Sequence, residues 1–489
     1  MKSANLKSNA FYNLLKTVST IFIPLIVFPY VTRVLLPDNI GKVNFAISFV
    51  SYFALIASLG VSTYAIREAS IVKTDQNALN KFASEVFSLN VITTIISYII
   101  FFITLFCFKE FAAYKELIII QSFSILLTTF GADWINSAME DFKYIAIRTF
   151  AIQILVLILT FTLVKKPEDL YIYMAINLLS SSGSNIINFF YRRKFCRIKF
   201  TFKINLKKHF KPILLLFVMS LAQIIFTNVD ITMLGIICND YEVGIYSTAL
   251  KLTHVIGQIV QSAAFVLIPR LSVLFERNDY SAINKLLRKI LNFNITLGLP
   301  SVVGTIMIAE DIILIIGGPE FHESANLMRI LILSFMFSLV GGSFVGNAIL
   351  IPNKQEKYYM YACIGTAVSN LILNLILIPY LGAMGAAIAT ASNGFVLMIL
   401  LLFKVDKTKI KITRLANLFI GPVVGCSLIA LVCFGFYYVD NFVIRIVFSI
   451  VCSIIIYGIS LLIFKNDLVF EMIEIIKKKI NSFIQRRNK

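Results

Sequence analysis

Charged residues, histidine and tryptophan are scarce in this chain. Of its 489 residues only 15% are Asp, Glu, Lys or Arg, and there are only three histidines and one tryptophan. A typical soluble domain is about one quarter charged. Apolar residues take the place of the missing charge: the set AVILMFWYC makes up 58% of the chain, and the mean hydropathy is +0.85. This composition excludes intrinsic disorder, collagen and a secreted disulfide scaffold, and it favours a membrane protein.

The usual signatures of catalysis and metal binding are missing from the sequence too. The seven cysteines form no CxxC pair, and most of them lie in apolar runs, as small core residues do. No HExxH, GxSxG or Walker motif occurs, and no GxGxxG stands in a strand context. We therefore expect no disulfide framework, no resident metal or cofactor, and no enzyme activity.

Long apolar runs fill most of the chain. A helix that crosses a membrane needs about 20 apolar residues, and fourteen runs come close to that length or exceed it. The first run follows three lysines, as in a signal peptide, but it is long and no small-residue cleavage site follows it, so we expect a retained first helix. The sequence thus predicts an all-α polytopic membrane protein with about 14 transmembrane helices. The runs are 12–35, 41–64, 83–107, 115–137, 145–164, 169–191, 212–237, 243–269, 288–317, 324–351, 358–379, 381–403, 414–438 and 442–464.

The distribution of Lys and Arg predicts the orientation of these helices. A formal net charge of +19 would suggest nucleic acid in a soluble protein, but in a membrane protein it reflects basic loops that stay in the cytoplasm. With the N-terminus inside, the predicted inner segments carry 36 Lys and Arg and the outer segments carry 7. We therefore expect both termini in the cytoplasm, an even number of helices and no nucleic-acid partner.

The longest predicted inner loop divides the chain. Residues 192–211 form a basic linker with six predicted helices before it. We expect an N-terminal lobe at 1–191, a C-terminal lobe of six helices at 212–403, and two further helices at 404–464. The tail at 465–489 has apolar residues at helical spacing among lysines and arginines. It predicts a helix on the inner membrane surface, with a solvated basic tail as the alternative.

A weak internal repeat supports the two lobes. Gly41 opens the second predicted helix, and Gly244 opens the eighth, 203 residues later. The dipeptide Lys-Tyr at 143 recurs at 357. Because six helices per lobe is an even number, both lobes would share one orientation, related by an axis along the membrane normal. Chance matches in an apolar chain are the alternative.

Ionisable residues inside apolar runs are the candidate functional residues, since each costs at least about 2.5–3.5 kcal/mol to insert. Asp230 and Lys251 lie at similar predicted depths in consecutive helices. The two residues predict one of three arrangements: a functional pair, a charge in a cavity without a partner, or an ion pair whose only role is to hold two helices together. The side chain of Arg33 is expected either to extend to the lipid headgroups or to point into a vestibule that is open to the outside. Asp133 beside Trp134 predicts a cavity carboxylate or an interfacial anchor.

Two arginines are predicted at inner helix ends, where they are gating or helix-end candidates. Arg67 precedes Glu68, and the two predict a surface charge pair. Arg270 follows Pro269, which predicts the end of a helix.

A basic residue deep within the predicted membrane helices suggests the kind of cargo that the protein carries. A basic residue such as Lys251 between two lobes suits an anionic substrate, for example a diphosphate-linked lipid, since lysine binds phosphate as a point charge. A charged headgroup with its sugars needs a polar cavity to cross hydrocarbon, and two lobes that rock about such a cavity provide alternating access. The residues alone therefore predict a transporter with a charged central cavity.

Six segments between about residues 29 and 357 carry a family resemblance. They are Pro29-Tyr30-Val31-Thr32-Arg33-Val34-Leu35-Leu36-Pro37 with Ile40-Gly41, Gly60–Glu68, Asp133-Trp134 with Glu140, Lys143, Tyr144, Ile145 and Arg148, Asp230–Lys251, Leu267–Ser272, and Ile351–Lys357. Together they resemble bacterial O-antigen flippases (Wzx type) of the multidrug/oligosaccharidyl-lipid/polysaccharide superfamily. Ala65 and the tripeptide Asn136-Ser137-Ala138 depart from the family pattern, and the last two helices match only by hydropathy.

The resemblance implies two six-helix lobes around a V-shaped cavity in a bacterial plasma (inner) membrane. It implies that polyprenyl-diphosphate-linked oligosaccharide repeat units, of O-antigen or capsule type, are flipped from the inner to the outer leaflet. Coupling to H⁺ or Na⁺ is implied as well, and a polysaccharide polymerase and a chain-length regulator are candidate partners. The residues carried over as cavity or gating candidates are Arg33, Asp133, Asp230 and Lys251.

Two other functions stay open at this stage. One is a related exporter of drugs or of the peptidoglycan lipid precursor. The other is a polytopic glycan enzyme, which usually carries catalysis in a large external loop. The longest predicted external loop here is only 309–323, which disfavours the enzyme.

Overall fold

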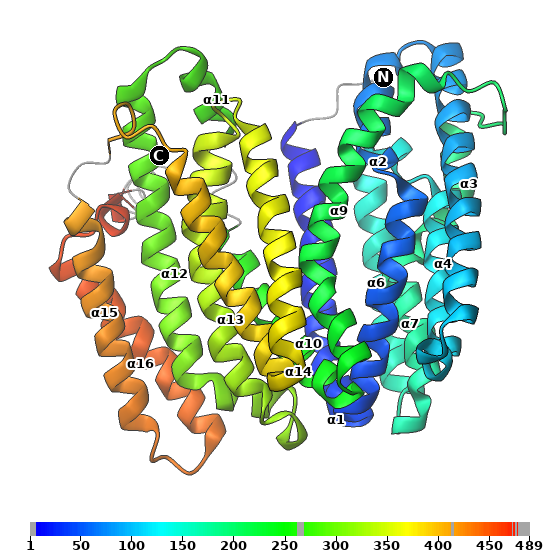
Figure 1. The fold of residues 1–489 in the computed structure, drawn as a ribbon. Coiled ribbons are helices and arrows are strands. Elements are labelled where there is room, and N and C mark those ends of the chain that lie inside the picture. The colour runs from blue at the N-terminus through cyan, green and yellow to red at the C-terminus, as the bar shows by residue number, and fades with distance from the viewer. Residues whose placement is uncertain (1–5, 262–267, 412–414, 472, 475–476, 478–489) are drawn as a thin grey trace, which may run out of the picture. The chain divides into compact units, whose positions relative to one another are not determined.

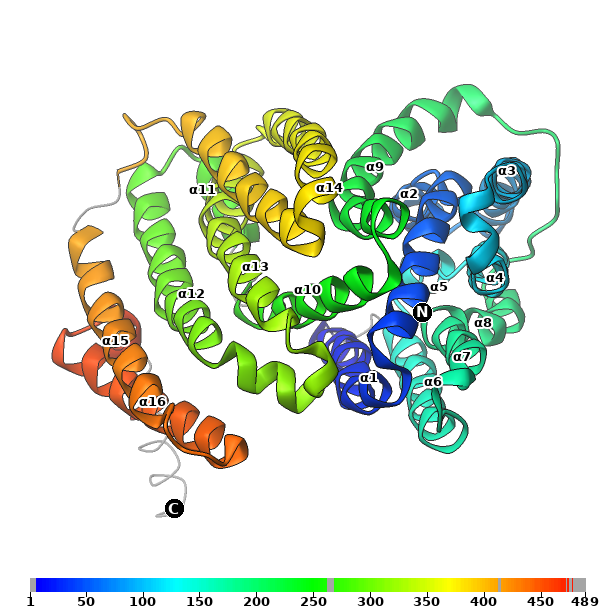
Figure 2. The same ribbon diagram turned by 60° about the horizontal axis from the view of Figure 1, so that its bottom comes forward.

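The computed structural model describes residues 6–261, 268–411, 415–471, 473–474 and 477. Within these residues every regular element is an α, 3₁₀ or π helix (Figures 1 and 2), which confirms the expected all-helical class. The chain forms two compact units: Met1–Ser247 with Ile316–Glu320, and Thr248–Ile315 with Phe321–Lys489.

The first unit holds the helices up to the start of α10. They are α1 (Leu6–Ser58), α2 (Val61–Val72), α3 (Gln76–Cys107), η1 (Lys109–Tyr114), α4 (Lys115–Gly131), α5 (Trp134–Ala138), α6 (Phe142–Leu163), η2 (Pro167–Asp169), α7 (Leu170–Ser182), α8 (Ser184–Tyr191), η3 (Arg192–Lys194), α9 (Leu206–Ile237) and the beginning of α10 (Asp240–Gln261).

The second unit holds most of the later helices. They are the rest of α10, α11 (Ile268–Glu276), α12 (Tyr280–Ile316), α13 (Ser324–Ser338), the π-helix η6 (Leu339–Leu350), α14 (Glu356–Phe403), α15 (Leu415–Phe436) and α16 (Phe442–Ile463). The short helix η5 (Pro319–Phe321) lies where the chain passes between the units.

Ten helices in the described part of the chain are long and apolar enough to cross a membrane. Two of them are far longer than one crossing requires. α1 has 53 residues and α14 has 48, which at 1.5 Å per residue correspond to about 80 and 72 Å, against about 30 Å of hydrocarbon. Each is therefore long enough for two crossings. The total of fourteen and the cytoplasmic termini stay predictions.

Both long helices are broken near the middle. In α1 the break is at Leu36 (φ 66°, ψ 168°), directly before Pro37. Proline disfavours the helical conformation of the residue before it, because its ring clashes with that residue's backbone. In α14 the break is at Gly382 (φ 54°, ψ −134°), a conformation that glycine adopts without strain. Figure 1 shows the chain turning back on itself at each break.

The start of α10 lies against the break in α1, backbone to backbone. A Cβ atom added at Gly41 would lie 1.8 Å from the carbonyl oxygen of Asp240, and one added at Gly244 would lie 2.0 Å from that of Pro37. Only glycine permits so close an approach of two backbones. The two glycines that suggested an internal repeat thus occupy reciprocal positions in one contact, while the repeat itself stays a prediction.

Polar bonds continue this contact along α1, α9 and α10. Asn44 Nδ2 donates to Ser247 Oγ at 3.0 Å, across 203 residues of sequence. One turn further, Ser48 Oγ donates to the backbone oxygen of Asn228 at 2.9 Å and lies 2.7 Å from Thr232 Oγ1. These hydroxyls satisfy one another inside the first unit, as buried polar groups in a membrane protein must.

The basic linker 192–211 lies along α3 rather than looping away from it. Alternate backbone N–H groups of the linker donate to side chains four residues apart on the helix. Two extended residues rise about 6.7 Å and four helical residues about 6 Å, so the two spacings match. The bonds are Arg197 N to Asn80 Oδ1 (2.8 Å), Lys199 N to Ser84 Oγ (3.0 Å) and Thr201 N to Ser88 Oγ (2.8 Å). The linker belongs to the first unit, and its role as the lobe boundary stays a prediction.

The chain after α16 is fastened to α12 by ion pairs. Asp467 Oδ2 lies 3.1 Å from Arg288 Nη2, and Glu471 Oε1 lies 2.5 Å from Lys289 Nζ. Residues 472, 475–476 and 478–489 of the predicted amphipathic tail fall outside the described residues.

Candidate functional site

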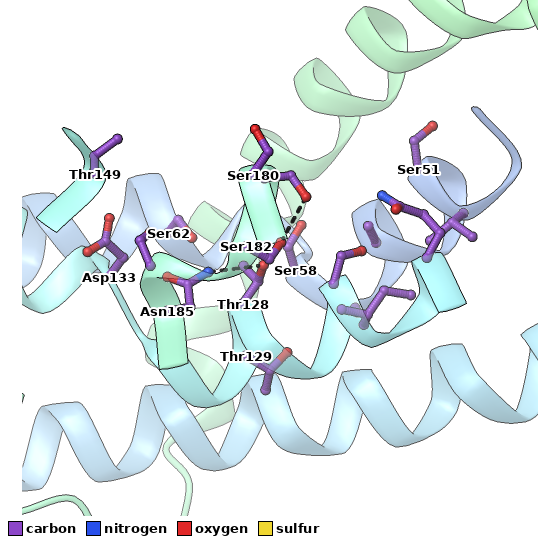
Figure 3. Close-up of a pocket in the computed structure, with 18 of the residues that line it drawn as sticks. Ser51, Ser58, Ser62, Thr128, Thr129, Asp133, Thr149, Ser180, Ser182 and Asn185 are labelled. Carbon is purple, nitrogen blue, oxygen red and sulfur yellow. Dashed lines mark hydrogen bonds between the residues drawn. The ribbon is translucent and has the colours of Figure 1, made fainter. Parts of the chain in front are cut away.

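A cavity of about 480 Å³ lies inside the first unit (Figure 3). Its described lining comes from α1, α2, α3, α4, α5, α6, α7 and α8 and from the turn between α4 and α5. Of the 25 lining residues, 12 are serine or threonine. They are Thr20, Ser51, Ser58, Ser62, Ser124, Thr128, Thr129, Thr149, Ser180, Ser181, Ser182 and Ser184.

Two features of the local sequence produce this polar wall. On α4, Gln121, Ser124 and Thr128 all line the cavity, because spacings of three and four residues place side chains on one face of a helix. Between α7 and α8 the segment 180–185 contains only Ser, Gly and Asn. Its small side chains surround the junction at Gly183 and leave the space that larger residues would fill.

An ion pair closes part of the cavity. Asp133 lies between α4 and α5, and its Oδ1 accepts a hydrogen bond of 2.6 Å from Arg148 Nη2 on α6. The Arg148 side chain is 2% exposed and that of Asp133 is 35% exposed. The carboxylate therefore faces the cavity with free acceptor capacity, while the buried guanidinium holds it in place and stabilises its charge.

Buried asparagines hold the helix ends beside this pair. Asn136 Nδ2 donates to Asn188 Oδ1, and Asn188 Nδ2 donates to the backbone oxygen of Gly131 at 2.8 Å. Asn185 Nδ2 lies 3.5 Å from Thr128 Oγ1 (Figure 3). Asn136, where the sequence departs from the flippase pattern, is thus fully buried and joins α5 to α8.

A second buried polar cluster joins α2, α3 and α9. His209 Nε2 lies 2.9 Å from Glu85 Oε2, and His209 Nδ1 lies 2.7 Å from the hydroxyl of Tyr64. All three residues are buried. The cluster fixes the end of the linker against α3, and none of its residues lines the cavity. Neither this cluster nor the role of Arg148 was predicted from the sequence.

Of the four predicted cavity residues, one lines this cavity. Asp133 lines the cavity, whereas Asp230 is 3% exposed and accepts a 2.6 Å hydrogen bond from the hydroxyl of Tyr246. Lys251 has an exposed side chain and belongs to the second unit, so its predicted pairing with Asp230 stays a prediction. Arg33 is exposed on α1 next to Gly318, where a Cβ atom would lie 3.5 Å from Arg33 Cγ.

The two helix-end arginines have different surroundings. Arg67 is exposed on α2, and its Nη2 lies 3.1 Å from Glu68 Oε1, as the predicted surface pair requires. The prediction that a helix ends at Pro269 is wrong, because α11 begins at Ile268 and continues through Arg270 to Glu276. Proline in the first turn of a helix is tolerated, since the N–H it lacks would have no partner there.

Among the residues that the structure describes, no group of three or more His, Cys, Asp or Glu side chains could hold an ion. The candidate site is thus a hydroxyl-lined cavity with one carboxylate–guanidinium pair, an arrangement suited to binding polar molecules rather than to bond-breaking chemistry.

Comparison with known proteins gives this cavity a context. The family model described as "Polysaccharide biosynthesis protein" matches residues 6–275, more than half of the chain. The model described as "Lipid II flippase MurJ" matches residues 186–455.

Two curated relatives resemble the chain over most of its length, and a third resembles about a third of it. The capsular polysaccharide biosynthesis protein CapF of Staphylococcus aureus is 25% identical over 375 residues, covering 76% of this chain and 91% of the relative. A putative O-antigen transporter of Shigella dysenteriae is 27% identical over 391 residues, covering 78% and 96%. A probable low-salt glycan biosynthesis flippase of Haloferax volcanii, Agl15, is 28% identical over 178 residues, which is 36% of each chain.

Solved structures share the fold. The lipid II flippase MurJ in an inward closed conformation superposes with a TM-score of 0.74 at 20% identity, covering 94% of this chain and 99% of that one. An inward-facing multidrug transporter of the MATE family superposes with a TM-score of 0.61 at 13% identity, covering 81% and 96%. At these identities the likeness establishes the polytopic helical fold alone.

Proposed function

The chain belongs to the polysaccharide biosynthesis protein family, a family of flippases rather than enzymes, and we propose that it moves a polyprenyl-diphosphate-linked oligosaccharide repeat unit from the inner to the outer leaflet. The repeat unit is of O-antigen or capsule type, in keeping with the names of the relatives from Shigella dysenteriae and Staphylococcus aureus. The membrane is the bacterial plasma membrane. A polysaccharide polymerase and a chain-length regulator are the partners we expect there.

The observation that carries the proposal is the hydroxyl-lined cavity of the first unit. Serine and threonine hydroxyls both donate and accept hydrogen bonds, and so do the hydroxyls of a sugar. The volume of about 480 Å³ falls in the usual range of about 300–1,000 Å³ for small-molecule sites. The carboxylate of Asp133 adds a strong acceptor, since hydrogen bonds to an ionised group are stronger than neutral ones.

Positive charge would serve the diphosphate of the same cargo. Lys251 and Arg33 are basic residues on helices of predicted membrane spans, and both have exposed side chains. We assign Lys251 to the diphosphate and Asp133 to the glycan, and Arg33 and Asp230 stay cavity candidates. Arg67 and Arg270 stay gating candidates. Alternating access, coupled to H⁺ or Na⁺, would then carry headgroup and sugars across while the lipid tail stays in the bilayer.

The peptidoglycan lipid precursor is the second candidate cargo. It is favoured by the match of the lipid II flippase model to residues 186–455. That precursor also carries a diphosphate, a polyprenyl chain and sugars, so the same cavity chemistry would serve it. The multidrug alternative is supported by the fold alone.

Leaflet sidedness tests the proposal directly. In the source organism with this gene deleted, radiolabelled lipid-linked repeat units should accumulate on the cytoplasmic face, and the gene supplied in trans should reverse this. The matched control is Lys411→Gln, an exposed change in a loop that lines no part of this cavity, which should restore sidedness as well as the unchanged gene. Unchanged sidedness with normal surface polymer would reject the glycan lipid as cargo. Accumulation of the peptidoglycan precursor instead would favour the second candidate.

A further inference from the structure

Two cavities of different chemistry lie next to each other where α14 ends in the second unit. One has a volume of about 430 Å³ and an almost wholly apolar lining that includes Phe344, Ile399 and Phe403. The other has a volume of about 290 Å³ and includes Lys404 and Lys409. The residues that line both cavities are Ile349, Val405 and Ile410.

We propose that this double cavity binds one anionic phospholipid of the bilayer, with the phosphate in the polar cavity and an acyl chain in the apolar one. The site lies entirely within the second unit and shares no residue with the cavity of the first. It would hold a resident lipid rather than the cargo, so the proposal does not depend on the function proposed above.

The charge of the loop after α14 matches a phosphate. Lys404 and Lys409 line the polar cavity and Lys407 lines the apolar one, against a single acid, Asp406. That acid holds the loop, because its Oδ1 accepts hydrogen bonds from the backbone N–H (2.9 Å) and hydroxyl (2.6 Å) of Thr408, and its Oδ2 lies 4.0 Å from Lys409 Nζ at the limit of an ion pair. These bonds lower the pKa of the Asp406 carboxyl, so the loop stays folded with its lysines in excess.

Neighbouring groups hold the two lysines of the polar cavity in position. Lys404 Nζ lies 5.5 Å from the ring centre of Tyr358, and Lys409 Nζ lies 5.7 Å from that of Tyr280, which is itself part of the lining. Asn284 on α12 fixes the loop, since its Nδ2 donates to the backbone oxygen of Lys409 at 3.2 Å. A basic pocket of this kind between membrane helices suits a lipid headgroup.

The apolar cavity has a buried wall and an exposed rim. Val345 and Ile349 of η6 are 0% and 2% exposed and form the wall, while Phe403 at the end of α14 is 80% exposed. A free anion such as inorganic phosphate would use only the lysines and leave this apolar surface uncovered. An acyl chain joined to the phosphate covers both, and burial of each CH₂ contributes about 0.8 kcal/mol to binding in general.

Lipid titration of the detergent-purified full-length protein, followed by native mass spectrometry, tests the site. Phosphatidylglycerol should bind more tightly than phosphatidylcholine. The double variant Lys404→Gln/Lys409→Gln should bind phosphatidylglycerol about 30-fold more weakly, since each surface lysine contributes about 1 kcal/mol to anionic lipid binding. The matched control, Lys411→Gln, changes an exposed lysine of the same loop that lines neither cavity and should bind as the wild type does.

A second variant tests the acyl chain. Ile399→Trp fills the apolar cavity and should weaken binding of phosphatidylglycerol while the protein still elutes as a folded species. Equal binding of the two phospholipids, or equal binding by the double-lysine variant and Lys411→Gln, would overturn the proposal. Displacement of the lipid by soluble glycerol phosphate would also overturn it, because that result would show a site for the anion alone. If a short-chain polyprenyl diphosphate displaces the bound lipid and added phospholipid does not, the site belongs to the cargo instead.

Discussion

Alanine in place of Gly244 would drive a methyl group into a backbone carbonyl. A Cβ atom there would lie 2.0 Å from the oxygen of Pro37, whereas ordinary contacts begin at 3.4 Å, so the two helices must separate by about 1.4 Å. The neighbour is backbone beside a helix break and not the end of a flexible side chain. We therefore expect this overpacking to lower the free energy of unfolding by about 3 kcal/mol, near the upper end of the usual range. The better helix propensity of alanine offsets about 1 kcal/mol, which leaves a net loss of about 2 kcal/mol.

Thermal unfolding in detergent measures this loss. A change of 1 kcal/mol shifts Tm by about 2–4 °C in a domain of this size, so Gly244→Ala should lower Tm by about 4–8 °C. Gly41→Ala should act similarly, since its Cβ atom would lie 1.8 Å from the oxygen of Asp240. The double variant should lose less than the sum of the two, because both changes separate the same pair of helices.

The control is a helical glycine with open space around it. Gly365 on α14 has nothing within 4 Å of an added Cβ atom, so Gly365→Ala should leave Tm unchanged or raise it by a few degrees through helix propensity, by about 2–4 °C at most. If Gly244→Ala has a Tm at or above that of the wild type, the two backbones are not in contact as described, and the reasoning fails.

Four further experiments test the charges and the topology. Lys251→Ala should cut surface polysaccharide at unchanged protein level, and Lys251→Arg should be milder; full-length polymer at the normal rate in the alanine variant would refute a role in binding the diphosphate. Arg148→Met should reduce export while Tm falls by only a few degrees, because Asp133 then loses its partner but is 35% exposed and stays solvated; export at wild-type level would remove the ion pair from the site. Glu85→Ala should cost about 1–3 kcal/mol, since it leaves buried His209 without its acceptor, and a wild-type Tm would contradict this. In a cysteine-free background, Glu320→Cys should react with an impermeant thiol reagent from outside and Lys203→Cys should not; the reverse pattern would invert the predicted topology.

The helical membrane fold could be predicted from the sequence because apolar runs of sufficient length have only one stable form in a bilayer. The breaks inside the long helices were predicted as well, since the runs 12–35 and 41–64 lie on either side of Leu36, and the runs 358–379 and 381–403 are divided close to Gly382. The prolines alone do not indicate which of them breaks α1. α1 contains Pro24, Pro29 and Pro37, yet only Leu36, before the third, leaves the helical conformation. A proline within a membrane helix can be tolerated if neighbouring groups satisfy the freed carbonyl, so tertiary packing decides which one breaks the helix.

The cavity could be predicted only in part. Asp133 was a candidate because a carboxylate in an apolar run is costly, and that cost demanded a partner or a cavity. Its partner, Arg148, lies on a separate helix, α6, so only the fold could join the two. The hydroxyls were overlooked because single serines are ordinary in membrane helices. The stripe of Gln121, Ser124 and Thr128 on α4 was the available signal, since its spacing places all three on one face.

Every described residue that lines the hydroxyl cavity falls between Lys16 and Asn185. The surface that we propose faces the glycan is therefore encoded by one continuous stretch of the gene, while the double cavity of the second unit is encoded after it. Recombination within the linker 192–211 could exchange this surface between relatives only if the contacts of α1 with α9 and with the start of α10 are kept. Surface polysaccharides that diversify quickly would thus need changes in less than half of the coding sequence to be matched by their transporter.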